Sequence, residues 1–288
     1  MKKHIFYLMV PAAILFNGCK DDPEPVPAYL DLQPFTVEAL GGASWQKITD
    51  GWLYVNGEFL GAYTLPTTIP ILAEGESEII LFPGVKENGI IATPNIYPFM
   101  TRYEAIQTLT PGENTTVNPV TEYDSGAMFP FNGRGDFDGS STLQFENRDG
   151  DAGTGYFLSS DDAFAGECLR MEVDTAHWLM EIASEKTALP TSGERQVWLE
   201  LHYKNDVPFS LYLLGSIGSS GEQAQAVYLF NDSDSWNKIY INLTEFLIAS
   251  LQDDYRLFFQ AGLPRDASNN FTQDKGTVLL DNIRLVHF

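Results

Sequence analysis

Residues 197–203 read Val-Trp-Leu-Glu-Leu-His-Tyr, and this stretch alternates between two kinds of side chain. The odd-numbered positions are aliphatic or aromatic, whereas Trp198, Glu200 and His202 occupy the even-numbered ones. A repeat of two places alternate side chains on opposite faces of an extended chain, so the stretch predicts a β-strand with one face in a core. Asn205 and Asp206 then form a turn into a second strand, Phe209–Leu214.

The remainder of the second half shows the same short alternating runs, and Leu243–Leu251 is the best helical candidate. Long helical periodicity is nearly absent, which predicts an all-β fold. The other predicted strands here are Leu143–Glu146, Leu169–Asp174, Ala226–Phe230, Trp236–Leu243, Tyr255–Ala261 and Thr277–Val286.

In the first half, Asn56-Gly57 separates two β-rich runs, Trp52–Val55 and Glu58–Thr64. This dipeptide favours a type I′ hairpin, because both of its residues tolerate positive φ. Further strands are predicted at Ile69–Leu72, Glu78–Phe82 and Thr115–Val120. We therefore expect two β-sandwich domains, an Ig-like one over residues 29–118 and a jelly roll over residues 125–288.

Three segments of the second domain resemble the jelly rolls of carbohydrate-binding modules and galactose-binding-like domains. They are the opening Phe145-Glu146, the middle Trp236-x-Lys-Ile-Tyr-Ile and the closing Leu280-Asp-Asn-Ile-x-Leu. In the first domain, Gly51–Leu65 resembles PEGA-type surface modules, in which a Val-Asn-Gly hairpin leads into a Gly and a Pro. These resemblances imply a fold and leave the function open, because such sandwiches host many roles.

The N-terminus has the parts of a secretory signal: Lys2 and Lys3, the apolar run Ile5–Phe16, and Cys19 directly after a small residue. The apolar run is too short to span a bilayer permanently. The arrangement predicts a bacterial lipoprotein signal, with residues 1–18 removed and lipid attached to Cys19. The alternative is an ordinary signal peptide that is cut elsewhere.

Residues 19–28 then form an acidic, Pro-rich tether that holds the folded part away from the membrane. Within it, Lys20, Asp21 and Asp22 resemble the export signal of surface lipoproteins in the Bacteroidetes. That resemblance implies an outer-membrane lipoprotein that faces the cell exterior. A periplasm-facing lipoprotein with a generic acidic tether is the alternative.

The chain carries 17 Lys and Arg against 39 Asp and Glu, which gives a formal net charge of −22. Such a surface repels nucleic acid and anionic lipid head groups, so neither is an expected partner. Hydrophobic residues make up 44% of the chain, which is ample for a core. Cys168 is the only cysteine besides Cys19, so the mature chain cannot form an internal disulfide.

If the odd-numbered positions of 197–203 form the core, then Trp198, Glu200 and His202 share an exposed face, and Tyr212 joins them from the next strand. An indole stacks on the apolar face of a sugar ring while polar neighbours bind its hydroxyl groups. The stretch therefore predicts a glycan-binding face. Burial under a loop, or a protein partner, are the alternatives.

The resemblance to jelly rolls also implies a structural calcium near the closing strand. Asn147, Asp149 and Asp151 follow alternating ligand spacing, and Glu146 and Asp281 are further oxygen donors that could converge with them. The loop is not an EF-hand, because Ala152 stands where that motif requires Gly. A solvated acidic loop is the alternative.

Catalysis has little support. The histidines of the mature chain, His177, His202 and His287, are scattered and form no His-Glu-x-x-His motif. A non-catalytic protein is therefore expected.

Asp174-Thr175-Ala176 resembles the general O-glycosylation pattern of the Bacteroidetes, which implies a glycan on Thr175.

Two functions compete for a surface-anchored lipoprotein of this kind, and a structural or adhesive surface protein is a weaker third option. In the first, it is an accessory subunit of an outer-membrane β-barrel complex for assembly, uptake or secretion, together with other lipoproteins. In the second, it binds polysaccharide at the cell surface through the jelly roll.

Overall fold

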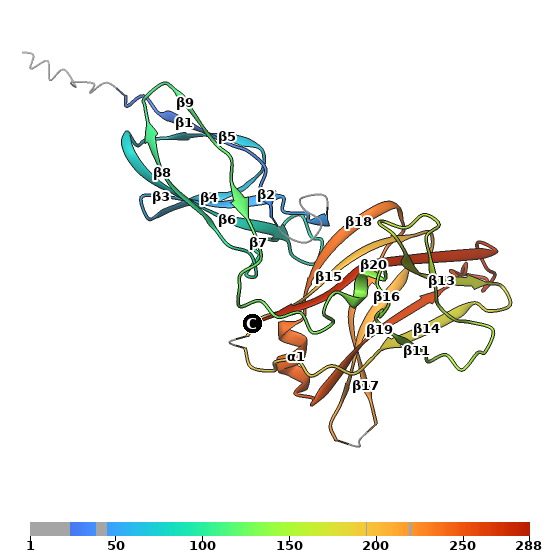
Figure 1. Ribbon diagram of the computed structural model, residues 1–288. Coiled ribbons are helices and arrows are strands. Elements are labelled where there is room, and N and C mark those ends of the chain that lie inside the picture. Colours follow the sequence, from blue (N-terminus) through green and yellow to red (C-terminus); the bar gives the residue numbers. More distant parts are fainter. Residues whose placement is uncertain (1–23, 39–44, 194, 219–220) are drawn as a thin grey trace, which may run out of the picture.

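The computed structural model describes residues 24–38, 45–193, 195–218 and 221–288 (Figure 1). The predicted signal peptide, Cys19 and the export signal Lys20–Asp22 lie outside these residues and stay predictions. The described chain forms two β-rich bodies, with all strands up to β10 in the first and all strands from β11 in the second. The predicted all-β fold class is confirmed.

The first body is built from three sheets around a small apolar core. One sheet has the order β5 (Thr67–Ile71), β1 (Ala28–Leu32), β9 (Asn114–Val117). The largest has the order β4 (Glu58–Thr64), β3 (Asp50–Val55), β6 (Gly75–Lys86), β7 (Pro94–Ile96), with β8 (Tyr103–Leu109) also on β6. The short strands β2 (Thr36–Val37) and β10 (Val120–Thr121) pair in parallel. Leu30, Leu53 and Leu81 are fully buried between the two larger sheets.

The β3–β4 hairpin confirms the turn that Asn56-Gly57 predicts. Val55 pairs with Glu58, so two residues form the connection. Asn56 has φ 52° and Gly57 has φ 81°, and both values fall in the left-handed region that this tight turn requires.

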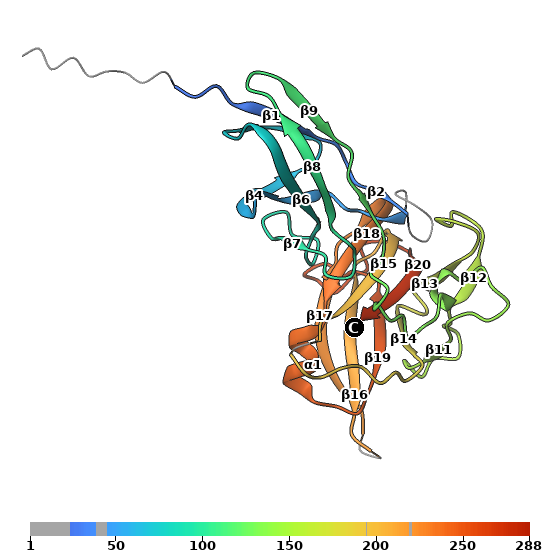
Figure 2. The same cartoon turned by 60° about the vertical axis from the view of Figure 1, so that its left-hand side comes forward.

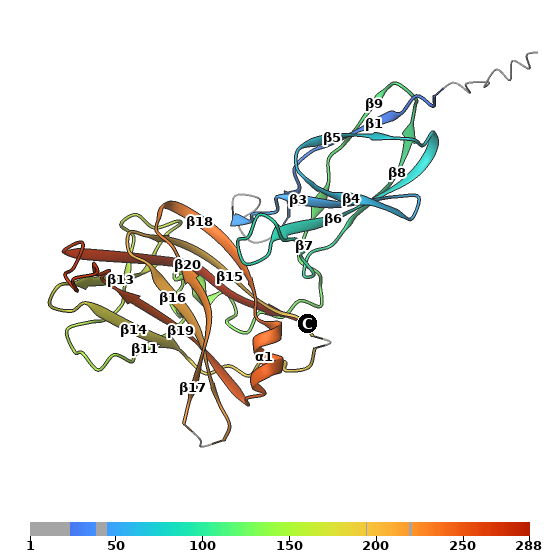
Figure 3. The same ribbon diagram turned by 180° about the vertical axis from the view of Figure 1, so that it is seen from behind.

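The second body is a sandwich of two five-stranded sheets (Figures 1 and 3). The sheet that we call the free sheet has the order β11 (Phe145–Asn147), β14 (Leu179–Ser184), β19 (Asp254–Gly262), β16 (Phe209–Ser216), β17 (Gln223–Phe230). The sheet that we call the docked sheet has the order β12 (Phe157–Ser159), β13 (Cys168–Asp174), β20 (Lys275–His287), β15 (Val197–Asn205), β18 (Ser233–Asn242).

The helical segments of the second body are short. A 3₁₀ turn, η2, covers Arg134–Asp136, and the helix α1 covers Thr244–Ser250, within the stretch predicted to be helical. Neither is long enough to cross a bilayer, and the described residues contain no other helix that could do so.

The core of the second body lies between its two sheets, and the odd-numbered positions of β15 face it as predicted. Val197, Leu199 and Leu201 are fully buried, and they pack with inward side chains of the free sheet such as Leu211 and Phe259. The alternation of 197–203 therefore identifies one face of β15 correctly.

Trp198, Glu200 and His202 on the other side of β15 are buried as well. The first body covers Trp198 and Glu200, and Phe164 from the loop between β12 and β13 stacks on His202. Trp198 and Glu200 are 0% exposed and His202 is 2% exposed. Trp198 lies against Tyr97 of the first body, with the ring centroids 5.5 Å apart. Figures 1 and 2 show the end of the first body beside β15 and β18. The prediction that Trp198, Glu200 and His202 form an exposed glycan-binding face is therefore wrong.

Glu200 is the centre of a buried polar network between the two bodies. Its Oε2 pairs with Lys238 Nζ at 2.5 Å and lies 3.5 Å from Arg284 Nη1. Its Oε1 accepts hydrogen bonds from the hydroxyl groups of Tyr97 and Tyr123. Burial by itself opposes ionisation of Glu200, but the two cations and the hydrogen bonds outweigh burial and lower its pKa to about 2.

Glu200→Gln is expected to lower the free energy of unfolding by about 3–5 kcal/mol, because it leaves Lys238 and Arg284 buried without an anionic partner. Urea denaturation at neutral pH measures the change. The matched control is Glu104→Gln, which breaks the exposed ion pair with Arg102 and is expected to cost at most about 1 kcal/mol. Equal effects of the two substitutions would contradict this account of the interface.

Candidate functional site

The outer face of the free sheet points away from the first body and carries an aromatic pair. Tyr212 on β16 lies opposite Phe258 on β19 in the strand register. Their rings meet edge to face, with centroids 5.6 Å apart and planes at 69°. Both side chains are partly exposed. The pair therefore presents aromatic surface to solvent on this sheet face.

Polar side chains form the next row of the same face. Gln260 on β19 lies between Ser210 on β16 and Glu181 on β14. The Gln260 amide donates to Glu181 Oε1, and the Tyr212 hydroxyl donates to Gln260 Oε1 at 3.4 Å. Hydrogen bonds thus link the Tyr212 hydroxyl, the Gln260 amide and the Glu181 carboxylate beside the aromatic pair.

The local sequence explains why these side chains face outward. On β16, Phe209, Leu211 and Leu213 point into the core, so Ser210 and Tyr212 between them must point out. The strand β19 repeats this pattern, with Leu257 and Phe259 inside and their neighbours Phe258 and Gln260 outside.

Charged residues border the aromatic pair on the other side. Arg256 lies two positions before Phe258 on the same face of β19, and its Nη1 lies 2.9 Å from Glu146 Oε2. Glu222 forms one ion pair with Arg256 at 3.0 Å and another with Arg148 at 2.8 Å. Together with Glu181, the face carries three carboxylates and two guanidinium groups.

Of the four residues predicted to bind a glycan, only Tyr212 lies on this face. It belongs to a different sheet from Trp198, Glu200 and His202, so the structure does not bring the four together. Phe258, Gln260 and Glu181 were missed. The alternation within Tyr255–Ala261 was a usable signal for the first two, but sequence alone could not show that this face is the uncovered one.

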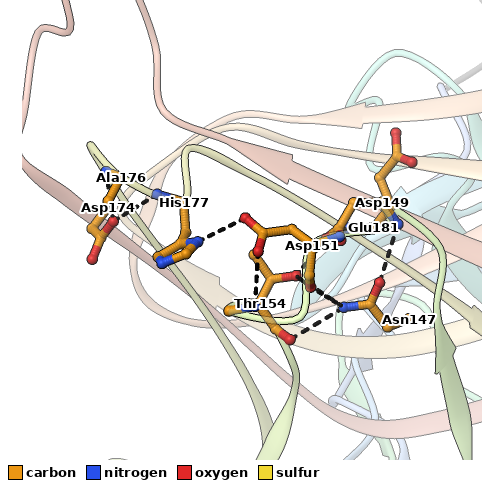
Figure 4. A network of polar contacts seen from close by, with 9 residues as sticks. Asn147, Asp149, Asp151, Thr154, Asp174, Ala176, His177 and Glu181 are labelled. Atoms are coloured by element: carbon orange, nitrogen blue, oxygen red, sulfur yellow. Dashed lines mark hydrogen bonds and ion pairs between the residues drawn. The ribbon is translucent and has the colours of Figure 1, made fainter.

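The acidic loop after β11 is a self-contained hydrogen-bonding network (Figure 4). Asp149 accepts from the Asp151 backbone N–H at 2.7 Å, from the Thr154 hydroxyl at 2.7 Å and from the Glu181 N–H at 3.2 Å. The Asn147 side chain donates to Thr154 Oγ1 at 2.9 Å. Asp149 and Asn147 thus fold the loop onto itself and onto β14.

Asp151 pairs with His177 from the turn before β14, at 2.7 Å between Oδ2 and Nδ1 (Figure 4). The hydrogen bond from His177 lowers the pKa of Asp151, and the same contact raises the pKa of His177. These shifts favour a charged pair at the surface.

The five oxygen donors predicted to converge on calcium do not meet in one place. Glu146 pairs with arginines, whereas Asp281 lies on β20 of the docked sheet at 1% exposure, where its Oδ1 accepts from the Asn282 N–H at 2.6 Å. Burial raises the pKa of Asp281 to about 8. Within the described ranges, no group of three or more His, Cys, Asp or Glu is placed to hold a metal ion. The five residues therefore do not fit one calcium site.

Thr175 is exposed in the turn between β13 and β14. Asp174 Oδ1 shapes this turn by accepting from the N–H groups of Ala176 and His177, both at 2.8 Å (Figure 4). Modification of Thr175 stays a prediction.

Cys168 is fully buried, and burial raises the pKa of its thiol to about 11, which removes its reactivity.

Comparison with known proteins finds likenesses in fold and none in sequence. No protein-family model and no curated protein matches the chain. Among solved structures, it is similar to a structure from a study of promiscuous specificity in carbohydrate-binding modules of the β-sandwich superfamily, at 12% identity and TM-score 0.39, over 82% of this chain and 84% of that one.

Two further structures are similar over part of the chain. One is a family 11 carbohydrate-binding module from Clostridium thermocellum in complex with a β-1,3-1,4-mixed-linked tetrasaccharide, at 16% identity and TM-score 0.35, over 52% of this chain and 91% of that one. The other is the enzymatically active domain of bacteriophage CBA120 tailspike protein 4, at 11% identity and TM-score 0.38, over 60% of this chain and 26% of that one.

His202 provides a prediction of pH dependence. Its ring stacks on Phe164 with centroids 4.1 Å apart, and burial, with a contribution from Lys238, lowers its pKa from 6.5 to about 3. The unfolded chain takes up this proton near pH 6.5 and the folded chain does so only near pH 3. Lowering the pH through that window therefore favours unfolding.

Between pH 8 and pH 5, the wild type is expected to lose about 2 kcal/mol more unfolding free energy than His202→Phe, which keeps a stacking ring and has no titrating group. Urea denaturation of both proteins at the two pH values measures the difference. Parallel losses in the two proteins would show that His202 titrates normally in the fold.

Proposed function

We propose that this protein binds a glycan at the cell surface and that the outer face of the free sheet is its binding face. The observation that carries the proposal is the solvent-facing Tyr212–Phe258 pair directly beside Gln260 and Glu181. The anchor at Cys19 and a position on the outer membrane, facing the exterior, are part of the proposal and are supported by the sequence.

The chemistry of the face suits a sugar. The apolar C–H face of a pyranose ring packs on an aromatic ring, which supplies contact area at little entropic cost because the ring is stiff. The Gln260 amide, the Glu181 carboxylate and the Ser210 hydroxyl can then bind the sugar hydroxyl groups and fix the orientation of the ring. The residues of the face include no nucleophile paired with a base, so binding is its proposed role.

The charge of the face indicates a neutral glycan. Glu181, Glu146 and Glu222 outnumber Arg256 and Arg148, and the two arginines are already paired with carboxylates. A polyanion would meet net negative charge there in addition to the acidic surface of the whole chain. An uncharged polysaccharide avoids this repulsion.

Tyr212→Ala and Phe258→Ala are each expected to weaken retention of a neutral polysaccharide about tenfold, because each removes half of the stacking surface. Affinity electrophoresis against a panel of neutral polysaccharides measures this. Phe59→Ala removes an exposed aromatic ring from the first body and is the control, expected to bind as the wild type does. The proposal fails if no polysaccharide retards the wild type, or if the variants are retained as well as the control.

A second candidate function, an accessory subunit of an outer-membrane β-barrel complex, is favoured by an aromatic surface on the first body. The outer side of its largest sheet carries Trp52, Tyr54, Phe59 and Phe82, with centroids 5.4 Å apart for Trp52–Phe59, 5.1 Å for Tyr54–Phe59 and 5.6 Å for Tyr54–Phe82. Phe59 is 49% exposed. Contiguous exposed aromatic surface is typical of protein interfaces.

Phe59→Asp is expected to abolish co-purification of a β-barrel protein and of other lipoproteins from outer membranes in mild detergent, because it places a charge in the middle of the apolar surface. Tyr212→Ala, on the other body, is expected to leave co-purification unchanged. Mass spectrometry of the tagged protein and its partners measures both. Recovery of wild-type protein alone would remove this second function.

A further inference from the structure

A cleft of about 380 Å³ lies between the two bodies. The first body contributes residues that precede β3, end β4 and β6, and form the β6–β7 loop, and the second body contributes residues of β15, β17 and β18. Interfaces between domains are a common place for ligand pockets, because two surfaces can enclose a small molecule that neither encloses alone.

The charge of this cleft is opposite to that of the chain. Lys47, Lys86 and Lys238 line it, and its lining contains no carboxylate. The whole chain, by contrast, has 17 Lys and Arg against 39 Asp and Glu. Lys86 and Lys238 are each paired with a carboxylate, so Lys47 supplies the net positive charge of the cleft, which favours an anion.

The three lysines differ in how they are neutralised. Lys86 Nζ pairs with Asp50 at 2.6 Å, and Lys238 Nζ pairs with Glu200 at 2.5 Å. Lys47 Nζ instead donates to the amide oxygen of Asn237 at 2.6 Å, and it forms no ion pair with any of the described residues. Partial burial lowers the pKa of Lys47, so a bound anion would relieve a desolvated charge.

The walls of the cleft are apolar and aromatic. The side chains of Tyr203, Tyr228, Tyr240 and Ile239 come from the second body, and Ile91, which is 80% exposed, stands at the rim on the first. The hydroxyl groups of Thr49 and Thr64 also line it. The cleft thus offers flat apolar surfaces, hydrogen-bonding hydroxyl groups and an unneutralised cation.

We propose that the cleft binds the uronate unit of an acidic oligosaccharide, with the carboxylate on Lys47 and the sugar ring against Tyr228 and Ile91. A ring with hydroxyl groups on its edge, an apolar face and one carboxylate matches each part of the lining. The proposal concerns a second site and does not rest on glycan binding by the free sheet, whose net negative charge favours a neutral ligand.

Isothermal titration calorimetry with trigalacturonate and with its neutral counterpart galactotriose tests the proposal on the full mature chain. The wild type is expected to bind trigalacturonate and to show no measurable binding of galactotriose at this site. Lys47→Gln is expected to weaken trigalacturonate binding about tenfold, because a hydrogen bond to a charged group is lost. Lys47→Arg keeps the charge and is expected to retain most of the affinity.

Lys275→Gln removes the same charge from an exposed position outside the cleft and is the matched control. It is expected to bind trigalacturonate as the wild type does, and Tyr212→Ala is expected to do so too, which separates this site from the free sheet. The proposal is overturned if the wild type does not bind trigalacturonate, if Lys47→Gln binds it as well as Lys275→Gln does, or if the Tyr212→Ala variant binds galactotriose as well as it binds trigalacturonate.

Discussion

The Glu200 carboxylate is fully buried between the two bodies, and it stays charged only because both bodies supply its partners. The hydroxyl groups of Tyr97, in the first body, and Tyr123, in the linking segment, donate hydrogen bonds to it. Lys238 and Arg284 of the docked sheet form ion pairs with it. Desolvating three charges is costly, and the cost is offset only when the whole set is assembled. The network therefore favours one relative position of the two bodies, and the aromatic contacts of Trp198 and Tyr240 with Tyr97 reinforce it.

This interface explains which parts of the structure could be predicted from the sequence. Alternation within residues 197–203 predicted the strand and its core-facing side, and Asn56-Gly57 predicted a hairpin and its turn geometry, because both depend on neighbours along the chain. Burial of Trp198 depends on Tyr97, about a hundred positions earlier, and no periodicity carries that information. Glu200 lies opposite Arg284 on the adjacent strand, but this pairing of opposite charges depends on the strand order, which the sequence alone does not show.

The acidic loop after β11 is a second place where the sequence alone could not predict the site. Oxygen donors at alternating positions suggest a cation site, but such residues also accept hydrogen bonds from the backbone N–H two positions ahead, and Asp149 and Asp151 both do so. A carboxylate committed to backbone donors and to His177 has little capacity left for a metal ion. The position of Asp281 on the other sheet could not be inferred without the strand order, which is a long-range property of the fold.

The two proposed binding sites differ in what they require of the fold. The face around Tyr212 and Phe258 lies within one sheet, so its geometry depends only on the register of β14, β16 and β19. The cleft around Lys47 exists only where the first body meets β18, and Lys238 belongs both to its lining and to the Glu200 network. Anything that loosens the network must therefore alter the cleft while leaving the free sheet intact. A buried ion pair that contributes little net stability can still determine a binding site, because it fixes where the two bodies lie.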